Sequence, residues 1–443
     1  GGREEEGRND MMVTVIGAGL AGCEAAWQIA ERGISVNLYD MKPAKFSPAH
    51  KNKNLCELVC SNSFKADRID SASGLLKEEL RNFNSLVLKC ADNCKVPAGG
   101  ALAVDREKFS SFVTENIRNH PLINVISEEI EEVPGFGINV IATGPLTSGK
   151  LAQSIRKICG ESLSFFDAAA PIITSESIDF DNAFFESRYG KGNGNDYLNC
   201  PLNEEEYKKF YLELISAQRA PLHGVDTENF RVYEGCMPVE VMAQRGEDTL
   251  RFGPMKPVGL TDPRTGKRPF AVIQLRKENQ EGTLYNMVGF QTNLKFPEQR
   301  RVFSLVSALN NLEIVRYGVM HRNTFIDSTK LLNADYSMRG NLDLYFAGQI
   351  TGVEGYMESV SSGLLAGINV ARKIQGMENI VLPKFTMIGA LANYISDESI
   401  ENFQPMGANF GIILPLTEVI KDKKIRYNMF AQRSLNYIKN LKI

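Results

Sequence analysis

The chain has 443 residues, and its 50 lysine and arginine residues against 53 acidic residues give a formal net charge of −3. A 43% hydrophobic content is enough to fill the cores of roughly two or three domains, and no long uncharged apolar run predicts a membrane span. Eight cysteines and four histidines without a CxxC or CxxH pair exclude a disulfide scaffold and argue against a structural zinc site.

The chain begins with GGREEEGRND, which is charged and has no apolar core. We expect residues 1–11 to be disordered, or an appended remnant, rather than a signal peptide. The protein is expected to be cytoplasmic, with its first predicted element beginning at Met12.

Residues 12–40, MVTVIGAGLAGCEAAWQIAERGISVNLYD, predict a strand, a glycine-rich turn, a helix and a second strand. In a GxGxxG turn the first glycine makes the bend, the second lets the backbone approach a pyrophosphate, and the third lets helix and strand pack closely. An acid at the end of the second strand can bond a ribose hydroxyl. The predicted dinucleotide site therefore consists of Gly17, Ala18, Gly19, Leu20, Ala21, Gly22 and Asp40.

Two later segments indicate that the dinucleotide is FAD. Residues 138–144, INVIATG, predict an apolar strand ending in ATG, a second signature of flavoproteins of the two-dinucleotide-binding type. Residues 342–372 predict a strand, a glycine-punctuated turn and a long helix of small residues, and in such flavoproteins this turn approaches the flavin end of FAD. The residues of these two segments that we expect to bind FAD are Gly144, Gly348, Gln349, Gly352 and Val353.

Because these signatures lie near both ends of the chain, the domain that binds FAD is expected to be discontinuous. The predicted fold class is α/β, with a Rossmann-type FAD-binding domain of the glutathione-reductase-like kind at residues 12–165 and 320–443. A mixed α+β insertion domain at residues 166–319 would carry the substrate or RNA. Residues 422–443 predict a basic amphipathic helix.

Between residues 250 and 330, short alternating strands are joined by basic turns, although the chain is slightly acidic overall. Basic residues interleaved with aromatic ones are typical of surfaces that bind nucleic acid. The aromatic residues that we expect to stack on bases are Phe270, Tyr285, Phe290 and Tyr317. A solvated sheet edge protected by lysines explains the same pattern without RNA.

Seven longer motifs resemble one family: ELVCSNSFKA (57–66), VPAGGALAVDR (96–106), YEGCMPVEVMA (233–243), FGPMKPVGL (252–260), YGVMHRNTFI (317–326), FAGQITGVEGYMES (346–359) and NFQPMGANFG (402–411). From Met12 onwards the chain resembles the folate- and FAD-dependent tRNA uracil-C5-methyltransferases of bacteria. Its GxGxxGCEAA opening and FAGQ turn are shared with a sister family, glucose-inhibited division protein A, whose added C-terminal helical domain does not fit in this length. Asp40 departs from the glutamate that relatives usually carry.

The resemblance implies methyl transfer without S-adenosylmethionine. The one-carbon unit would come from 5,10-methylenetetrahydrofolate, with FADH2 as reductant or methylene carrier and NADH or NADPH reducing the flavin. The acceptor would be the T-loop uridine of tRNA, which becomes ribothymidine. We expect a monomer or weak dimer that binds the tRNA T-arm, folate and nicotinamide cosubstrates.

This chemistry needs a reactive thiol, because C5 of uracil is a poor nucleophile until a thiolate adds at C6. The resemblance puts forward Cys236 in EGCMP and Cys60 in LVCSNS. Our hypothesis assigns the addition to Cys236 and proton transfer or protection of an intermediate to Cys60, with the reverse assignment left open. The other six cysteines are expected to be structural, and no metal ligands are expected.

Further residues are expected to contact folate or RNA. An imidazole from His321, or alternatively from His50, would cover a pterin stacked on the flavin. Glu354 and Glu358 would hold pterin nitrogens or a proton, although the charge preference of a helix N-terminus explains both equally well. The remaining candidates for folate or RNA are Arg322, Asn323, Lys256, Lys267 and Arg268.

Three other functions fit parts of this pattern. They are the same chemistry on a uridine of large-subunit ribosomal RNA, a small-molecule NAD(P)H flavin oxidoreductase, and a non-catalytic flavin-binding interaction protein. Salt-dependent binding to unmodified tRNA would separate the oxidoreductase from the leading interpretation. Tritium release from tRNA labelled at uracil C5 would exclude the non-catalytic protein.

Overall fold

The structure is a computed structural model, and it describes residues 11–46, 50–59, 61–144, 149–160, 163–164, 167–190, 194, 196–221, 237–321, 325–401 and 403–443. The chain divides into two compact units. The first comprises Gly1–Ser164, Thr324–Glu398 and Pro405–Ile443, and the second comprises Phe165–Asn323 and Ser399–Gln404. Residues 399–404, which the sequence analysis assigned to the FAD-binding part, thus group with the second unit. Of residues 1–11, predicted to be disordered or an appended remnant, residues 1–10 lie outside the described residues, and Met11 is exposed.

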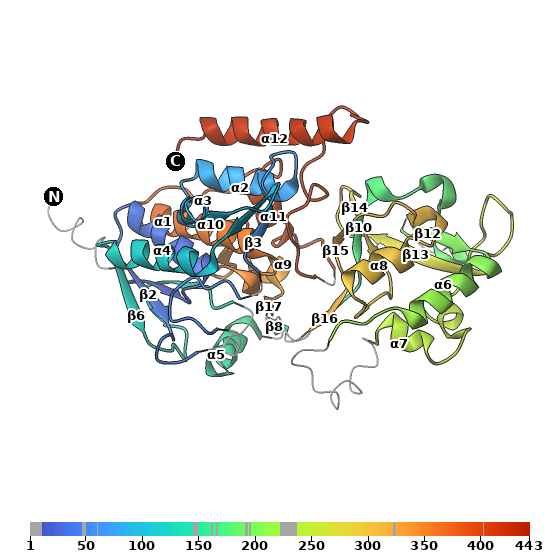
Figure 1. Ribbon diagram of the computed structural model, residues 1–443, viewed down its shortest axis with the longest axis horizontal. Helices are drawn as coiled ribbons and strands as arrows, with labels where there is room; N and C mark the ends of the chain where they lie inside the picture. The colour runs from blue at the N-terminus through green and yellow to red at the C-terminus, as the bar shows by residue number, and fades with distance from the viewer. Residues whose placement is uncertain are drawn as a thin grey trace. The chain divides into compact units, whose positions relative to one another are not determined.

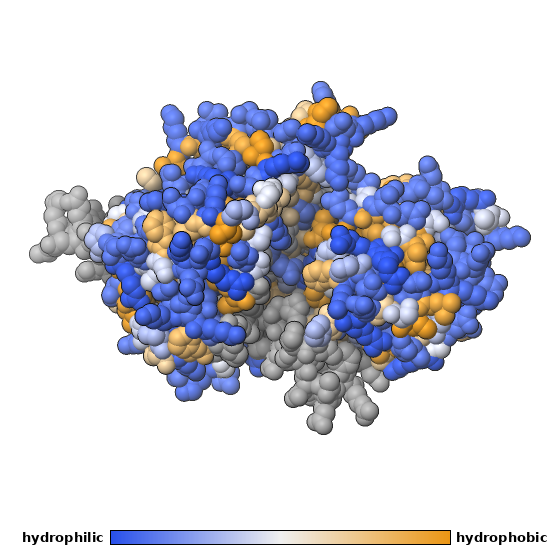
Figure 2. All heavy atoms as spheres, viewed as in Figure 1, coloured by the Kyte–Doolittle hydropathy of each residue, from blue (hydrophilic) through white to orange (hydrophobic). Residues whose placement is uncertain are grey.

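The helices of the first unit are α1 (Leu20–Glu31), α2 (Ala72–Asn82), α3 (Leu86–Asp92), α4 (Arg106–Asn119), α5 (Gly149–Cys159), α9 (Ser328–Leu331), α10 (Tyr356–Ile374), α11 (Met387–Tyr394) and α12 (Lys423–Asn440). Its strands are β1 (Val13–Ile16), β2 (Val36–Asp40), β3 (Ser63–Ala66), β4 (Lys95–Val96), β5 (Ala101–Val104), β6 (Ile123–Ser127), β7 (Ile138–Ile141), β8 (Leu163–Ser164), β17 (Phe325–Ile326), β18 (Ser337–Met338) and β19 (Asn341–Phe346). The predicted C-terminal helix is confirmed by α12, whose surface in Figure 2 is mostly hydrophilic with a few apolar patches.

A six-stranded sheet with the order β18-β19-β7-β1-β2-β6 forms the centre of the first unit. All its neighbouring strands are parallel except β18, which runs antiparallel to β19. The fully buried runs VTVI in β1 and INVI in β7 are typical of parallel strands covered on both faces. From β1 the chain continues to β2 and β6 on one side, and later to β7 and β19 on the other. The change of direction therefore lies between β1 and β7, where parallel α/β sheets bind ligands.

Helix α10 packs closely on α1, because two of its residues lack a side chain (Figure 1). A Cβ on Gly363 would lie 2.2 Å from the Ala21 carbonyl oxygen, and one on Gly367 would lie 2.6 Å from that of Ala25. These positions need glycine for space. The predicted helix of small residues is thus the helix that covers the glycine-turn helix.

Helix α2 is held against α11 and α12 by a buried carboxylate. Glu79 accepts hydrogen bonds from the backbone N–H groups of Met387 (2.7 Å) and Ile388 (2.8 Å) and from the Ser434 hydroxyl (2.7 Å). Burial raises the pKa of Glu79 to about 7, although all three donors favour its ionised form. The C-terminal segments are therefore attached to the first unit through an ionisable group.

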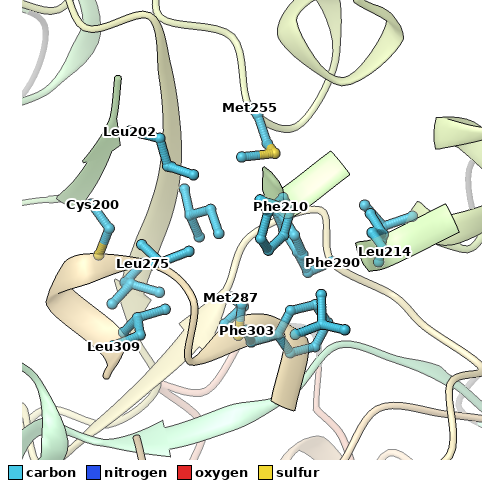
Figure 3. Packing of buried hydrophobic residues seen from close by; sticks show 14 of the residues in the cluster. Cys200, Leu202, Phe210, Leu214, Met255, Leu275, Met287, Phe290, Phe303 and Leu309 are labelled. Atoms are coloured by element: carbon cyan, nitrogen blue, oxygen red, sulfur yellow. The ribbon is translucent and has the colours of Figure 1, made fainter. Parts of the chain in front are cut away.

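The second unit is built on an antiparallel sheet, and its described residues include three α-helices. Its helices are α6 (Glu204–Ser216), α7 (Val239–Ala243) and α8 (Phe296–Phe303), and its strands are β9 (Asp167–Ala169), β10 (Ile172–Thr174), β11 (Phe184–Phe185), β12 (Leu198–Leu202), β13 (Ala271–Lys277), β14 (Leu284–Met287), β15 (Ile314–Arg316) and β16 (Val319–His321). The six-stranded sheet has the order β11-β12-β13-β14-β10-β15, and β9 pairs with β16. Figure 3 shows its core, in which Phe210 of α6 and Phe303 of α8 meet Phe290 beside the sheet.

Candidate functional site

The three glycine signatures of the sequence meet at one edge of the parallel sheet. Strands β19, β7 and β1 are neighbours, so their carboxyl ends deliver residues 347–353, 142–144 and 17–22 to the same side. Backbone hydrogen bonds join these ends, from Ala142 N–H to Ile16 C=O (2.8 Å) and from Ala347 N–H to Ile141 C=O (2.9 Å). The site predicted from three separate segments is therefore one structural feature.

The glycines of the first turn are required for two different reasons. A Cβ on Gly17, whose φ is +102°, would lie 2.3 Å from the Ala142 carbonyl oxygen, and one on Gly22 would lie 1.7 Å from that of Gly17. A Cβ on Gly19, by contrast, meets no atom within 4 Å. Gly17 and Gly22 thus serve packing, whereas Gly19 borders open space in front of the α1 N-terminus. That is where an anion is favoured by unpaired backbone N–H groups.

Asp40 lies at the end of β2, beside this turn, as the sequence analysis predicted. Its Oδ2 atom is buried and has no hydrogen-bond partner among the described residues. Burial raises the pKa of Asp40, while Lys42 and His50 act to lower it. A buried carboxylate oxygen without a partner is costly, and a ribose hydroxyl donor would satisfy it. Gly19 and Asp40 together fit a dinucleotide.

Two residues that the sequence analysis did not select organise the segment before Cys60. The buried Lys42 donates from Nζ to the carbonyl oxygens of Asn52 (3.0 Å) and Asn54 (2.6 Å), and it pairs with Glu57 at 3.4 Å. His50 lies in the electrostatic field of Lys42, Glu57 and Asp40, and burial lowers its pKa. The structure therefore places His50 beside the predicted ribose acid.

The late glycine turn is held in place from both sides. Gly348 has a φ of +82°, and its N–H donates to the Ser362 hydroxyl at 2.7 Å, while a Cβ there would lie 3.2 Å from that of Ala21. Gly352 also has a positive φ, of +89°. Val353 is buried, and Gln349 and Glu354 are half-buried. Backbone bonds from Glu354 N–H to Met406 C=O (2.9 Å) and from Met406 N–H to Gly352 C=O (2.8 Å) attach the PMGANFG motif to this turn.

The first residue of α10 contacts the segment that follows Cys60. The Ser61 N–H donates to the Tyr356 hydroxyl at 3.0 Å, and the Tyr356 ring meets Phe64 edge-on at 5.8 Å. Cys60 itself lies outside the described residues. Tyr356 belongs to the quoted motif EGYMES, but nothing in local spacing identifies its partner.

Two buried charged residues lie near the start of α10. Lys77 of α2 donates from Nζ to the Phe64 carbonyl (2.7 Å) and the Ser73 hydroxyl (2.6 Å), and burial lowers its pKa to about 8. Glu358 accepts from the Ala408 N–H at 3.3 Å, and its pKa is raised by burial, with Lys65 and Lys77 acting in the opposite direction. Glu358 was a sequence candidate for holding pterin nitrogens or a proton. Lys77 was not singled out from sequence alone, because its burial depends on packing between distant segments.

The described cysteines are packing residues, as predicted. Cys23, Cys56, Cys90, Cys159 and Cys200 are buried, and Cys94 is half-buried. Burial raises the pKa of the thiols of Cys56, Cys90, Cys94, Cys159 and Cys200, and a raised pKa disfavours the nucleophilic thiolate. Cys60 and Cys236 both lie outside the described residues.

In the second unit, one short segment holds both sides of residues 222–236, which lie outside the described part of the chain and include Cys236. Asn293 makes two hydrogen bonds with Ala220. Its Nδ2 donates to the Ala220 carbonyl (3.0 Å), and the Ala220 N–H donates to the Asn293 carbonyl (2.8 Å). On the other side, the buried Glu240 accepts from the Thr292 hydroxyl (2.8 Å) and the Asn293 N–H (2.7 Å). His321 ends β16, while Arg322 and Asn323 are not among the described residues.

The basic turn of the second unit is a surface feature, but its predicted aromatic partners are largely internal. Lys256, Lys267 and Arg268 are exposed. Tyr285 is 3% exposed and Phe290 is 0% exposed, so the prediction that they stack on bases is wrong. Their alternation belongs to a sheet whose inner face fills the core. Phe270 is covered by the Arg251 guanidinium, 3.6 Å from its ring centroid.

The part of the chain that the structure describes contains no group of three or more histidine, cysteine or acidic residues arranged to bind a metal ion. Within the same ranges, none of the helices combines the length and apolarity that a membrane crossing requires.

Fold and site together define an α/β protein in which three glycine turns meet at one edge of a mostly parallel sheet, with an antiparallel sheet in the second unit. The family model for glucose inhibited division protein A matches residues 12–378. The methylenetetrahydrofolate–tRNA-(uracil-5-)-methyltransferase TrmFO of Acetivibrio thermocellus is 59% identical over 96% of this chain and 98% of its own length, and that of Halalkalibacterium halodurans is 57% identical over 97% and 98%. The chain therefore belongs to this methyltransferase family within the wider glucose inhibited division protein A group, and the predicted resemblance is confirmed.

A solved structure, that of Aquifex aeolicus GidA, is 15% identical and aligns over 97% of this chain and 73% of its own, with a TM-score of 0.49.

Proposed function

We propose that this protein transfers the one-carbon unit of 5,10-methylenetetrahydrofolate to C5 of the T-loop uridine in tRNA, using FAD and a nicotinamide cosubstrate. The substrates follow from the family, whose members at 55–59% identity are named for methylenetetrahydrofolate, tRNA and uracil C5. The observation that carries the proposal is the meeting of three glycine turns beside Asp40, whose buried Oδ2 has no partner in the part of the chain that the structure describes. We assign FAD binding to the first unit and RNA binding to the second.

Several residues of the first unit would hold FAD. The open space at Gly19 and the N-terminus of α1 suit the pyrophosphate, and Asp40 would accept a ribose hydroxyl. The turn from Gly348 to Val353 suits the flavin end, because its glycines keep the backbone free of side chains there. Bound FAD would supply the electrons that reduce the transferred methylene to a methyl group.

The nucleophile would be one of the two cysteines outside the described residues. The other six thiols are buried or half-buried, which supports their structural role. A thiolate from Cys236 would add to uracil C6 and leave after the C5 proton is removed, and Cys60 would assist proton transfer. The Ser61–Tyr356 hydrogen bond attaches the residue that follows Cys60 in sequence to the first residue of α10, next to the late glycine turn.

The test replaces each cysteine by alanine. With T-arm RNA that contains 5-fluorouracil, wild-type protein should form a covalent complex, and Cys236→Ala should abolish it. Cys94→Ala is the matched control, because Cys94 is the half-buried thiol without an assigned role, and it should retain full activity. Full methylation by both Cys60→Ala and Cys236→Ala would overturn the assignment. Mass spectrometry of tRNA and ribosomal RNA from cells that lack the protein tests the target.

A further inference from the structure

An exposed aromatic pair lies on the second unit outside the site described above. The rings of Phe296, the first residue of α8, and Tyr317, which precedes β16, are stacked with centroids 4.4 Å apart and planes 14° apart. Phe296 is 49% exposed and Tyr317 is half-buried, so Phe296 is the outer ring of the pair. A hydrophobic ring with this much exposure on a packed unit is available to stack on a further flat group.

Cations adjoin the outer ring. Arg300 follows Phe296 by one helical turn, on the same face of α8, and it acts on Tyr317 to lower its pKa against the rise caused by burial. Lys295, the residue before α8, is also exposed. Among the described residues Arg300 forms no ion pair, whereas its neighbour Arg301 is bound by Glu298 (2.9 Å) and Glu213 (2.5 Å). Positive charge beside the ring is thus left for a partner.

The buried side chain of Gln299 holds the two segments that carry the pair together. Gln299, 0% exposed, donates from Nε2 to the carbonyls of Leu294 and Gly318 and accepts from the Gly318 N–H, each at 2.8 Å. These bonds fix α8 to the residue that follows Tyr317. A platform whose geometry is set before binding loses little entropy when a ligand stacks on it.

The position along the chain connects the pair to the candidate chemistry. Phe296 follows the segment 291–294 that anchors Ala220 and Glu240 on either side of residues 222–236. Tyr317 is the first residue of the motif YGVMHRNTFI, which contains β16 and its last residue, His321. Around α8 the surface mixes hydrophilic and apolar residues, as Figure 2 shows.

We propose that Phe296 and Tyr317 form a stacking platform for one unpaired nucleobase of an RNA loop, with Arg300 holding the adjoining phosphate. Aromatic faces flanked by cations bind single-stranded nucleic acid in this way, because every base has a flat face and every nucleotide a phosphate. An open ledge on a helix suits a splayed base better than a small ligand, which is usually enclosed by a concave site. This inference rests on the proposed function and narrows its partner to an unstacked nucleotide.

The test compares two RNAs of equal length, a T-arm hairpin and a blunt duplex, by fluorescence anisotropy. Phe296→Ala should bind the hairpin about 5- to 150-fold more weakly and the duplex as wild type does. Phe296→Trp should restore hairpin binding. Arg300→Gln should weaken both RNAs and lower the slope of log affinity against log salt by about 1. Phe136→Ala is the matched control, because Phe136 is 66% exposed in the first unit.

Each remaining outcome decides between the alternatives. Wild-type hairpin affinity in Phe296→Ala, or an equal loss on hairpin and duplex, would overturn the platform. A raised KM for methylenetetrahydrofolate with hairpin affinity unchanged would overturn it in favour of a folate contact. If wild-type protein bound the hairpin without methylating it, while Phe296→Ala still lost affinity, the proposed function would fail and the platform would stand.

Discussion

Ser61 and Tyr356 are joined by a hydrogen bond of 3.0 Å across 295 positions of sequence. The donor is the backbone N–H of the residue after Cys60, and the acceptor is the hydroxyl of the first residue of α10. Because α10 follows the glycine turn at 348–355, this bond links the candidate thiol segment to the turn that we assign to the flavin. Phe64 extends the link through its edge-on contact with the same ring.

Tyr356→Phe should separate this hydrogen bond from the ring contact. The variant keeps the contact with Phe64 but leaves the Ser61 N–H without its acceptor, so the free energy of unfolding should fall by about 1 kcal/mol. The rate of methyl transfer should also fall, through a lower kcat rather than a raised KM, and the activation free energy should rise by more than the unfolding free energy falls. Tyr336→Phe is the control, because the Tyr336 hydroxyl is buried without a partner among the described residues and its loss should cost no stability. Unchanged kcat in Tyr356→Phe would contradict the link.

Gly22→Ala should destabilise the protein without FAD, whereas Gly19→Ala should weaken only the binding of FAD. The new Cβ of Gly22→Ala would lie 1.7 Å from the Gly17 carbonyl oxygen, so the melting temperature of the FAD-free protein should fall. That of Gly19→Ala meets no atom within 4 Å, so this variant should melt normally yet bind FAD more weakly. Calorimetry and an FAD titration separate the two. Normal FAD affinity in Gly19→Ala would show that no pyrophosphate approaches this residue.

FAD affinity should depend on the ionisation of Asp40. Burial raises the pKa of its carboxyl group in the free protein, and a ribose hydroxyl donates to the ionised form. Affinity should therefore rise as the pH rises through this raised pKa. Asp40→Asn should remove the pH dependence and weaken binding by about 10- to 100-fold, while Asp40→Glu should retain both. If FAD affinity depended on pH equally in wild type and in Asp40→Asn, a group other than Asp40 would be responsible for the pH dependence.

The free energy of unfolding of the first unit should decrease as the pH rises, because of Glu79. Its pKa of about 7 in the fold lies above the ordinary 4.5, so the folded state keeps the proton to a higher pH than the unfolded state does. The stabilisation is complete below pH 4.5 and is lost as the pH rises through 7. Relative to Glu79→Gln, wild type should lose roughly 3 kcal/mol of unfolding free energy across this range. If urea unfolding gave the same free-energy difference between wild type and Glu79→Gln near pH 4.5 and near pH 8, this prediction would be refuted.

The local elements of the dinucleotide site could be predicted because their requirements are local. A tight turn needs Gly17 wherever it occurs, and buried parallel strands need apolar runs such as those of β1 and β7. The predicted strand of 12–16 is observed as Val13–Ile16, and the basic tail helix as Lys423–Asn440. The family motifs led to the methyltransferase family for the same reason, since each is a continuous stretch of sequence.

The aromatic residues show where this reasoning stops. Phe290 and Phe296 are six positions apart in one basic region, yet Phe290 is 0% exposed and Phe296 is 49% exposed. From sequence, Phe290 and not Phe296 was expected to stack on bases, because composition does not distinguish exposed aromatic residues from buried ones. The side of a strand or helix that faces the core depends on which elements pack against it, and this is not encoded within a short window.

The sequence by itself determined the glycine turns, the parallel strands that precede them and the family to which the chain belongs. Only the tertiary structure decided that those turns share one sheet edge, that Oδ2 of Asp40 has no partner among the described residues, and that Ser61 meets Tyr356. Backbone conformation follows from neighbouring residues, whereas burial and hydrogen-bond partners are set when segments far apart in sequence pack together.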